Sequence, residues 1–182
     1  MENPRKEITG VVEGLCSAKN ADSQRDVLQR YFTNDASFDH PLCAVSSYPG
    51  SRDTGVLPIY QWLRIMFLDT LIKVHDIGFD QETNRLFVRV TQQLRWRLSP
   101  IRHFYAPTVE LVVLLDLSKG SDGKLYIARQ VDLYAVQQVT HFIIPYSKEV
   151  IEYIKLFAGF MCLVLAVLFQ TLGFWRLSAK HA

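Results

Sequence analysis

A run of 20 residues without a charged side chain, from Leu156 to Trp175, constrains the fold of this chain more than any other feature. A helix of that length is about 30 Å long, which matches the hydrocarbon thickness of a bilayer. A soluble domain this small rarely covers a helix that is apolar all round. Lys155 and Arg176 bracket the run, and Trp175 stands where interfacial aromatic residues are common. The sequence therefore predicts a membrane span over residues 156–175 rather than a buried core helix.

The position of this run predicts a topology. Only seven residues follow it, an arrangement typical of a tail anchor. Residues 1–10 lack the apolar stretch of a signal peptide. We therefore expect residues 1–147 to form a domain in the cytosol, and residues 148–182 to form the anchor with a short tail. We expect the endoplasmic reticulum membrane, with the mitochondrial outer membrane and the peroxisome as alternatives.

Charge and cysteine usage limit what residues 1–147 can do. Four of the 20 Lys and Arg residues and two of the 18 Asp and Glu residues lie beyond residue 147, so the preceding part carries 16 of each. A neutral domain is unlike a general nucleic-acid binder. Cys16 and Cys43 stand outside the span without a CxxC motif, as expected in a reducing compartment. The histidines lack HxxxH or HxH spacing and no phosphate-binding glycine loop occurs, so neither metal nor cofactor is expected.

Helical periodicity comes first in this domain and strand alternation follows. The spacing of apolar residues predicts helices over 6–18 and 22–32, the second capped by Asp22, and a third helix that contains Ile59 and ends near Thr70. Strands are expected over residues 36–45, 72–79, 85–98, 109–117 and 125–136. This order predicts an α+β domain, with three N-terminal helices packed on a curved, mostly antiparallel sheet.

Three stretches carry a resemblance to a known family: ITGVVEGL, VLQRYFTNDASFDHP and DGKLYIARQVDLY. Over most of residues 5–136, the chain resembles the NTF2-like superfamily of cone-shaped domains, which includes the SnoaL-like proteins and ketosteroid isomerase. Among its members, it is most similar to the fungal SigF-like NTF2-like proteins, in which such a domain is joined to a C-terminal membrane segment. The resemblance implies the NTF2-like cone but no single activity, because this fold hosts isomerases, cyclases, dehydratases and non-enzymatic adaptors.

The resemblance also bears on whether isomerase chemistry is retained. The position of the isomerase's carboxylate base falls at His40, and the positions of its two oxyanion donors fall at Leu15 and near Val113. Without donors at the developing oxyanion, the largest contribution to that reaction is missing. Ketosteroid isomerase chemistry is therefore not expected.

Asp39 and His40 stand side by side before a proline, as a catalytic pair would. Neighbouring side chains of an extended strand point to opposite sides, so an inward Phe38 implies an inward His40 and an outward Asp39. The two cannot share one pocket. We favour a structural role for His40, with a lone base as the alternative.

Asp132 is the second catalytic candidate, in a row that alternates with Tyr134 along the last strand. This row faces either the pocket or the solvent, and the sequence supports both equally. In the first case, His40 and Asp132 are a candidate acid/base couple.

Residues 95–107 interleave basic and aromatic side chains, which suits a headgroup interface. An ordinary hairpin whose aromatic side chains cap the core is the alternative. The candidate membrane-interface residues are Arg95, Arg97, Arg102, Phe104, Tyr105 and Trp175.

The leading hypothesis is a tail-anchored, non-catalytic NTF2-like domain that binds an apolar ligand or a protein partner at a cytosolic membrane surface. The candidate pocket residues are Phe38, His40, Trp62, Met66, Gln92, Trp96, Asp132 and Tyr134. The alternative is a membrane-tethered SnoaL-like isomerase, dehydratase or cyclase that uses His40 and Asp132 on a lipid-like substrate. A homodimer that pairs through the sheet is a further expectation.

Overall fold

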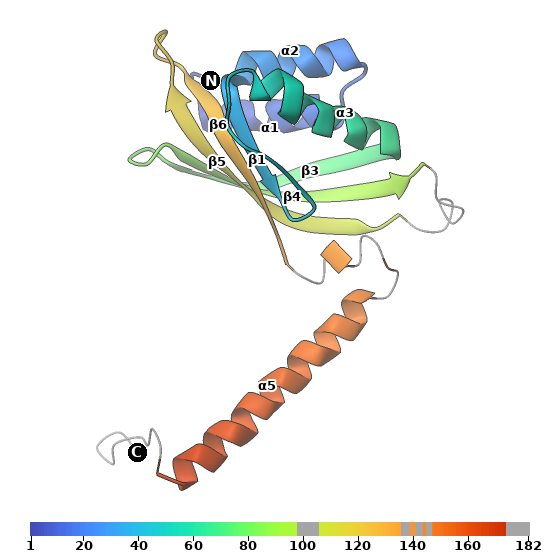
Figure 1. The fold of residues 1–182 in the computed structure, drawn as a ribbon, viewed down its shortest axis with the longest axis vertical. Helices are drawn as coiled ribbons and strands as arrows, with labels where there is room; N and C mark the ends of the chain where they lie inside the picture. The colour runs from blue at the N-terminus through green and yellow to red at the C-terminus, as the bar shows by residue number, and fades with distance from the viewer. Residues whose placement is uncertain (98–105, 136–138, 141–143, 145–146, 174–182) are drawn as a thin grey trace.

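An N-terminal α+β domain and a long C-terminal helix make up the computed structural model of the chain (Figure 1). The structure describes residues 1–97, 106–135, 139–140, 144 and 147–173. The helices are α1 (Pro4–Cys16), α2 (Ala21–Tyr31), the π-helical turn η1 (Arg52–Val56), α3 (Leu57–Met66) and α5 (Ser147–Thr171). The strands are β1 (Phe32–His40), β2 (Cys43–Val45), β3 (Phe67–Asp80), β4 (Arg85–Trp96), β5 (Thr108–Lys119) and β6 (Leu125–Tyr134).

Side-chain caps determine where the first two helices begin. Asn3 accepts a hydrogen bond from the Lys6 backbone N–H, ahead of a proline in the first turn of α1. Helix α2 is capped by Asn20, whose side chain accepts from the Ser23 N–H at 2.8 Å. The predicted cap at Asp22 is therefore wrong, because the helix begins at Ala21 and Asn20, two residues before Asp22, accepts from the Ser23 N–H.

The six strands form one sheet in the order β2-β1-β6-β5-β4-β3, in which β1 and β6 are parallel and all other neighbours are antiparallel. The α+β class and the mostly antiparallel sheet are confirmed. The expected strand over 36–45 is instead a hairpin of β1 and β2. Helix α3 ends at Met66 rather than near Thr70, because Phe67 already pairs with Trp96 in the β3–β4 ladder. Long-range pairing here overrides the helical spacing of the sequence.

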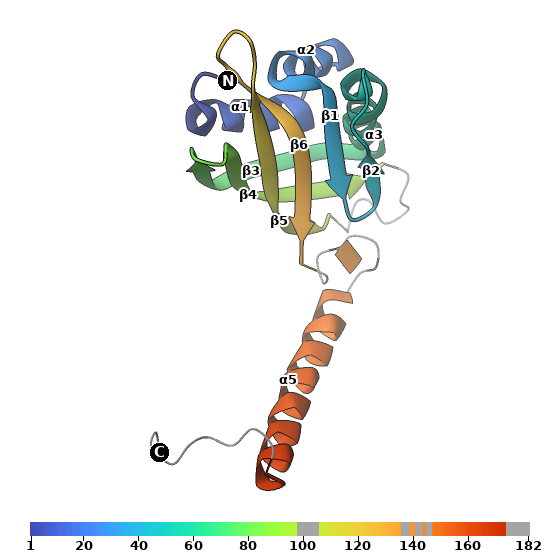
Figure 2. The ribbon, with the colours of Figure 1, turned by 60° about the vertical axis from the view of Figure 1, so that its left-hand side comes forward.

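The helices cover the concave face of the sheet, as Figure 2 shows. Ile8 and Val11 of α1 are fully buried there, together with Leu86 and Val88 of β4. The opposite face carries ion pairs between neighbouring strands, such as Arg89 to Asp76 at 2.6 Å and Arg89 to Glu110 at 2.7 Å. These pairs are exposed and contribute little stability. They keep the outer face polar, so the apolar side of each strand lies under the helices.

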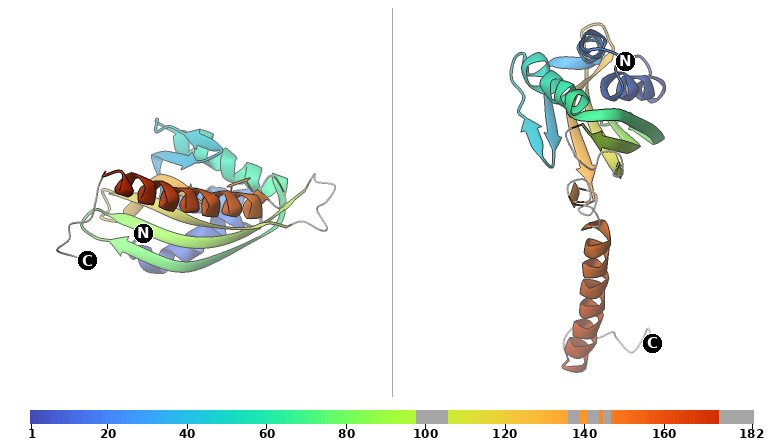
Figure 3. Two further views of the ribbon diagram at one scale, coloured as in Figure 1. Left: turned by 90° about the horizontal axis from the view of Figure 1, so that it is seen from below. Right: turned by 90° about the vertical axis from the view of Figure 1, so that its right-hand side faces the viewer.

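Helix α5 has the length and composition of a membrane span. Its 25 residues measure about 37 Å, and none of its side chains is buried. It is the one helix of this kind among the described residues. Figure 3 shows it extending away from the α+β domain. The predicted C-terminal apolar helix is therefore confirmed, and it begins at Ser147, before the predicted span.

Candidate ligand cavity

A cavity of about 760 Å³ lies between the helices and the concave face of the sheet. Clefts of roughly 300–1,000 Å³ are typical of sites for small organic molecules. Most of its wall is hydrocarbon from α1 and the central strands, including Val11, Leu15, Val90, Leu115 and Ile127. Such a wall suits an apolar ligand, so the few polar groups decide the ligand's chemistry.

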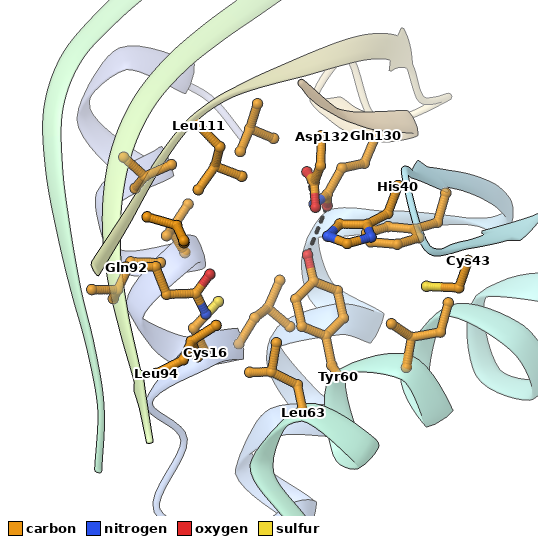
Figure 4. A pocket seen from close by; sticks show the side chains of 18 of the residues that line it. Cys16, His40, Cys43, Tyr60, Leu63, Gln92, Leu94, Leu111, Gln130 and Asp132 are labelled. Atoms are coloured by element: carbon orange, nitrogen blue, oxygen red, sulfur yellow. Dashed lines mark hydrogen bonds between the residues drawn. The ribbon is translucent and has the colours of Figure 1, made fainter. Parts of the chain in front are cut away.

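Strand topology gathers the polar groups. Because β1 and β6 run parallel, Phe38 lies beside Gln130. Two residues further along each strand, His40 and Asp132 lie on the same wall of the cavity. Figure 4 shows the Asp132 carboxyl group and the His40 ring at this wall of the cavity. The sheet therefore unites two residues that are 92 positions apart in the sequence.

A buried chain of hydrogen bonds supports this wall. The Tyr60 hydroxyl donates to Gln130 Oε1 at 2.7 Å, and Gln130 Nε2 donates to Asp132 Oδ1 at 2.8 Å (Figure 4). The backbone of Tyr60 is held in turn by the buried Gln24 amide, which donates to its carbonyl oxygen at 3.2 Å. Satisfied buried networks are rigid, so the Asp132 carboxyl group has a defined position.

Burial changes the protonation of Asp132. It raises the pKa of this carboxyl group from 3.8 to about 7, while the Gln130 hydrogen bond lowers it and nearby Asp39 raises it further. The group is therefore partly protonated near neutral pH. In that state it can both donate and accept a hydrogen bond.

His40 faces the cavity as a neutral ring. It stacks on Phe38 at 6.2 Å between centroids and meets Tyr134 edge-on at 5.0 Å. Burial lowers the pKa of His40, against an opposing effect of Asp39. Its Nδ1 accepts from the Leu42 N–H at 3.1 Å, so the neutral ring carries its proton on Nε2.

The predicted orientation of the Asp39-His40 pair is observed. His40 lines the cavity, whereas Asp39 is exposed and lies 4.0 Å from the Arg129 guanidinium. Asp132 lines the cavity, and Leu133 next to it is exposed. Of the two orientations that the sequence leaves open for this row, the structure therefore has the one that faces the pocket.

Gln92 supplies a polar group on the facing wall. Its side chain reaches into the cavity from β4 (Figure 4) and is 5% exposed. Its Nε2 has no hydrogen-bond partner among the described residues. A buried amide without a hydrogen-bond partner reduces stability by about 1–3 kcal/mol. A hydrogen bond to a polar atom of a ligand, or to a water molecule, removes this cost.

Other groups around the cavity limit its chemistry. The two positions matched to oxyanion donors, Leu15 and Val113, are buried and present hydrocarbon to the cavity. Cys16 lines the wall, but burial raises the pKa of its thiol to about 12, so it is not a thiolate nucleophile at neutral pH. Over the described part of the chain, no cluster of three metal-ligating side chains occurs.

The structure brings together seven of the eight candidate pocket residues. Phe38, His40, Trp62, Gln92, Trp96, Asp132 and Tyr134 all line the cavity. Met66 does not, because α3 ends there and Phe67 contributes the next side chain to the wall. Tyr60 and Gln130 were not among the candidates. Gln130 alternates with Asp132 in the sequence, whereas no local pattern indicates that Tyr60 hydrogen-bonds to it.

The candidate membrane-interface residues are only partly described. Arg97 donates its backbone N–H to the Met66 carbonyl oxygen at 2.7 Å, and its guanidinium donates to the carbonyl oxygens of Ile65 and Arg64. This cation caps the C-terminus of α3, a structural role. Arg95 is half-buried on β4. Arg102, Phe104, Tyr105 and Trp175 lie outside the described residues.

The fold and the cavity together define an NTF2-like α+β cone followed by an apolar helix. The model of the SigF NTF2-like domain family matches residues 1–174. The chain therefore belongs to the SigF NTF2-like family. No protein of curated function matches the chain at a significant level.

Solved structures confirm the fold at low sequence identity. A proposed scytalone dehydratase from Novosphingobium aromaticivorans is 14% identical, with a TM-score of 0.54 over 72% of this chain and 84% of that one. A proposed polyketide cyclase from Xanthomonas campestris is 16% identical, with a TM-score of 0.51 over 75% and 96%. An NTF2-like protein of unknown function from Exiguobacterium is 8% identical, with a TM-score of 0.54 over 71% and 98%. At these identities the likeness shows the fold alone.

Proposed function

We propose that this chain is a membrane-tethered binding protein for an uncharged amphiphile, a molecule with an apolar body and a hydroxyl or carbonyl oxygen. The proposal includes a tail anchor that holds the domain on the cytosolic face of a membrane. The observation that carries it is the 760 Å³ hydrocarbon cavity into which the unpartnered amide of Gln92 projects.

The polar groups favour a neutral ligand. The described wall contains no Lys or Arg side chain, and its one basic residue, His40, is neutral. A carboxylate or phosphate group in the cavity would lack a cationic partner and would face Asp132. A hydroxyl or carbonyl oxygen can instead accept from the Nε2–H of His40 or from Gln92.

The test compares two ligands that differ only in their polar end. Parinaryl alcohol and parinaric acid are titrated by fluorescence into the full chain in uncharged detergent micelles at pH 8. We expect saturable binding of the alcohol and weaker binding of the acid. Filling the cavity with Leu111→Phe should reduce binding of the alcohol. Equal affinity for both ligands, or equal binding by the filled variant, would overturn the proposal.

A second function is favoured by the environment of Asp132. The Asp132 carboxyl group has a pKa of about 7 and lines the same cavity as His40. When ionised it can remove a proton from carbon, while the Nε2–H of His40 donates to the substrate carbonyl oxygen. This is the isomerase, dehydratase or cyclase alternative on a lipid-like substrate. The hydrocarbon at Leu15 and Val113 counts against it, since these positions give no further donors.

Mass spectrometry separates the two functions. The full chain and Asp132→Asn are each incubated with a membrane lipid extract, and the bound lipid is identified. If the chain only binds its ligand, the same lipid molecule is recovered from the unmodified chain and from Asp132→Asn. A product that appears with the unmodified chain and is absent with Asp132→Asn would establish the enzyme instead.

A further inference from the structure

The cavity and the membrane helix share one end of the domain. β1 and β6 are parallel, so His40 and Tyr134 both stand where these strands end, and both line the cavity. Leu111 pairs with Tyr134 near the start of β5, and Trp96 ends β4. These lining residues therefore lie at the end of the sheet from which β6 leaves. The side chains of Leu42 and Trp62 also line the cavity and are exposed, so they mark its mouth.

The chain continues from this mouth to α5. Tyr134 ends β6 and Ser147 begins α5, which leaves 12 residues between them. Val139, within this connection, lines the cavity. Figures 1 and 2 show β1 and β6 both pointing toward the end of the domain at which α5 begins. A bilayer that contains α5 would lie next to the mouth.

The two ends of the domain differ in polarity. At the mouth, two large apolar side chains that line the cavity are exposed: Leu42 of the β1–β2 turn at 54% and Trp62 of α3 at 50%. The end of the domain farthest from α5 carries the β5–β6 turn, residues 120–124 (Figure 1). This turn is polar, with the sequence GSDGK. Exposed aromatic and aliphatic side chains beside a membrane helix suit the headgroup and acyl boundary.

We propose that the mouth docks on the bilayer that holds α5, so that the ligand passes between membrane and cavity without crossing water. This inference rests on the proposed function and names the source of the ligand: an uncharged amphiphile dissolved in the same membrane. Leu42 and Trp62 form the docking surface. The polar turn at residues 120–124 lies at the end of the domain farthest from α5 (Figure 1).

Site-specific fluorescence tests this orientation in the full chain, reconstituted into phosphatidylcholine vesicles. The background carries Cys43→Ser and Cys162→Ala; Cys16 stays, because its buried thiol with a raised pKa labels slowly. A nitrobenzoxadiazole probe is attached through Leu42→Cys at the mouth or through Ser121→Cys in the far turn. Phospholipids brominated on their acyl chains then quench whichever probe enters the bilayer.

We expect strong loss of fluorescence for the probe at residue 42 and none for the probe at residue 121. Equal quenching at both positions, or none at residue 42, would overturn the docking proposal; in the second case a protein partner would be the occupant of the mouth. The same labelled chains are titrated with parinaryl alcohol in micelles. Binding without quenching at residue 42 leaves the proposed function standing and removes the docking. Quenching without binding removes the proposed function, and with it the proposed route of the ligand.

Discussion

Replacing Asp132 by Asn should stabilise the domain at alkaline pH, and the effect should vanish in acid. In the folded state, burial raises the pKa of Asp132 from 3.8 to about 7. Well below pH 3.8 both folded and unfolded chains hold the proton, so no difference arises there, and at pH 4 the difference is still small. Between pH 4 and 7 the unfolded chain loses its proton first, and stability falls as the pH rises. The difference between the two pKa values, at about 1.4 kcal/mol per pKa unit, amounts to roughly 4 kcal/mol above pH 7.

The Asn variant has the size of the aspartate and keeps an oxygen that accepts the Gln130 hydrogen bond, but it carries no charge. We therefore expect a Tm about 10 °C above that of the unmodified chain at pH 8, and a difference near zero at pH 4. The assay is thermal unfolding of both full chains in detergent micelles across this pH range.

The comparison isolates Asp132 from other titrating groups. His40 also faces this wall and has a lowered pKa, but it is present in both proteins, so its effect cancels in the difference. Cys16, Tyr60 and Tyr134 have raised pKa values and stay protonated throughout the range. Asp39→Asn is the matched control, because this neighbouring carboxylate is exposed, and we expect little change. A Tm difference for Asp132→Asn that stays constant from pH 4 to 8 would refute the reasoning.

Three further predictions concern packing, His40 and the anchor. Gly55→Ala should destabilise the domain by about 1–3 kcal/mol, because the new Cβ would lie 2.5 Å from Val45 Cγ1. Gly10→Ala has open space on α1 and should stabilise the domain by about 0.5–1 kcal/mol. Chemical denaturation of the full chain measures both changes, and equal effects would contradict the packing argument. His40→Gln should fold and bind parinaryl alcohol, while His40→Asp should lower the Tm at pH 8 by placing a charge in the apolar wall; equal melting curves would contradict this. The full chain should stay in the membrane pellet at alkaline pH while residues 1–147 stay soluble, and full-length protein in the supernatant would exclude the span.

Much of the secondary structure follows from local patterns in the sequence. In β4, apolar residues such as Leu86 and Val88 alternate with Arg85 and Arg89, and the structure buries the apolar set and exposes the arginines. The uncharged run predicts α5 because no other environment accommodates so long an apolar surface. These features are local: a period of two or 3.6 residues decides which side chains share a face.

The site depends on contacts between distant segments. The sequence shows that Asp132 alternates with Tyr134, but only the pairing of β6 with β1 and β5 decides that this row faces the cavity. Tyr60 reaches Gln130 because α3 crosses the concave face, which no local pattern encodes. The shift in the Asp132 pKa likewise arises from the surrounding hydrocarbon of several elements. Periodicity along the chain determines the faces of each element, whereas the packing of one element on another determines which face encloses a cavity and how its polar groups ionise.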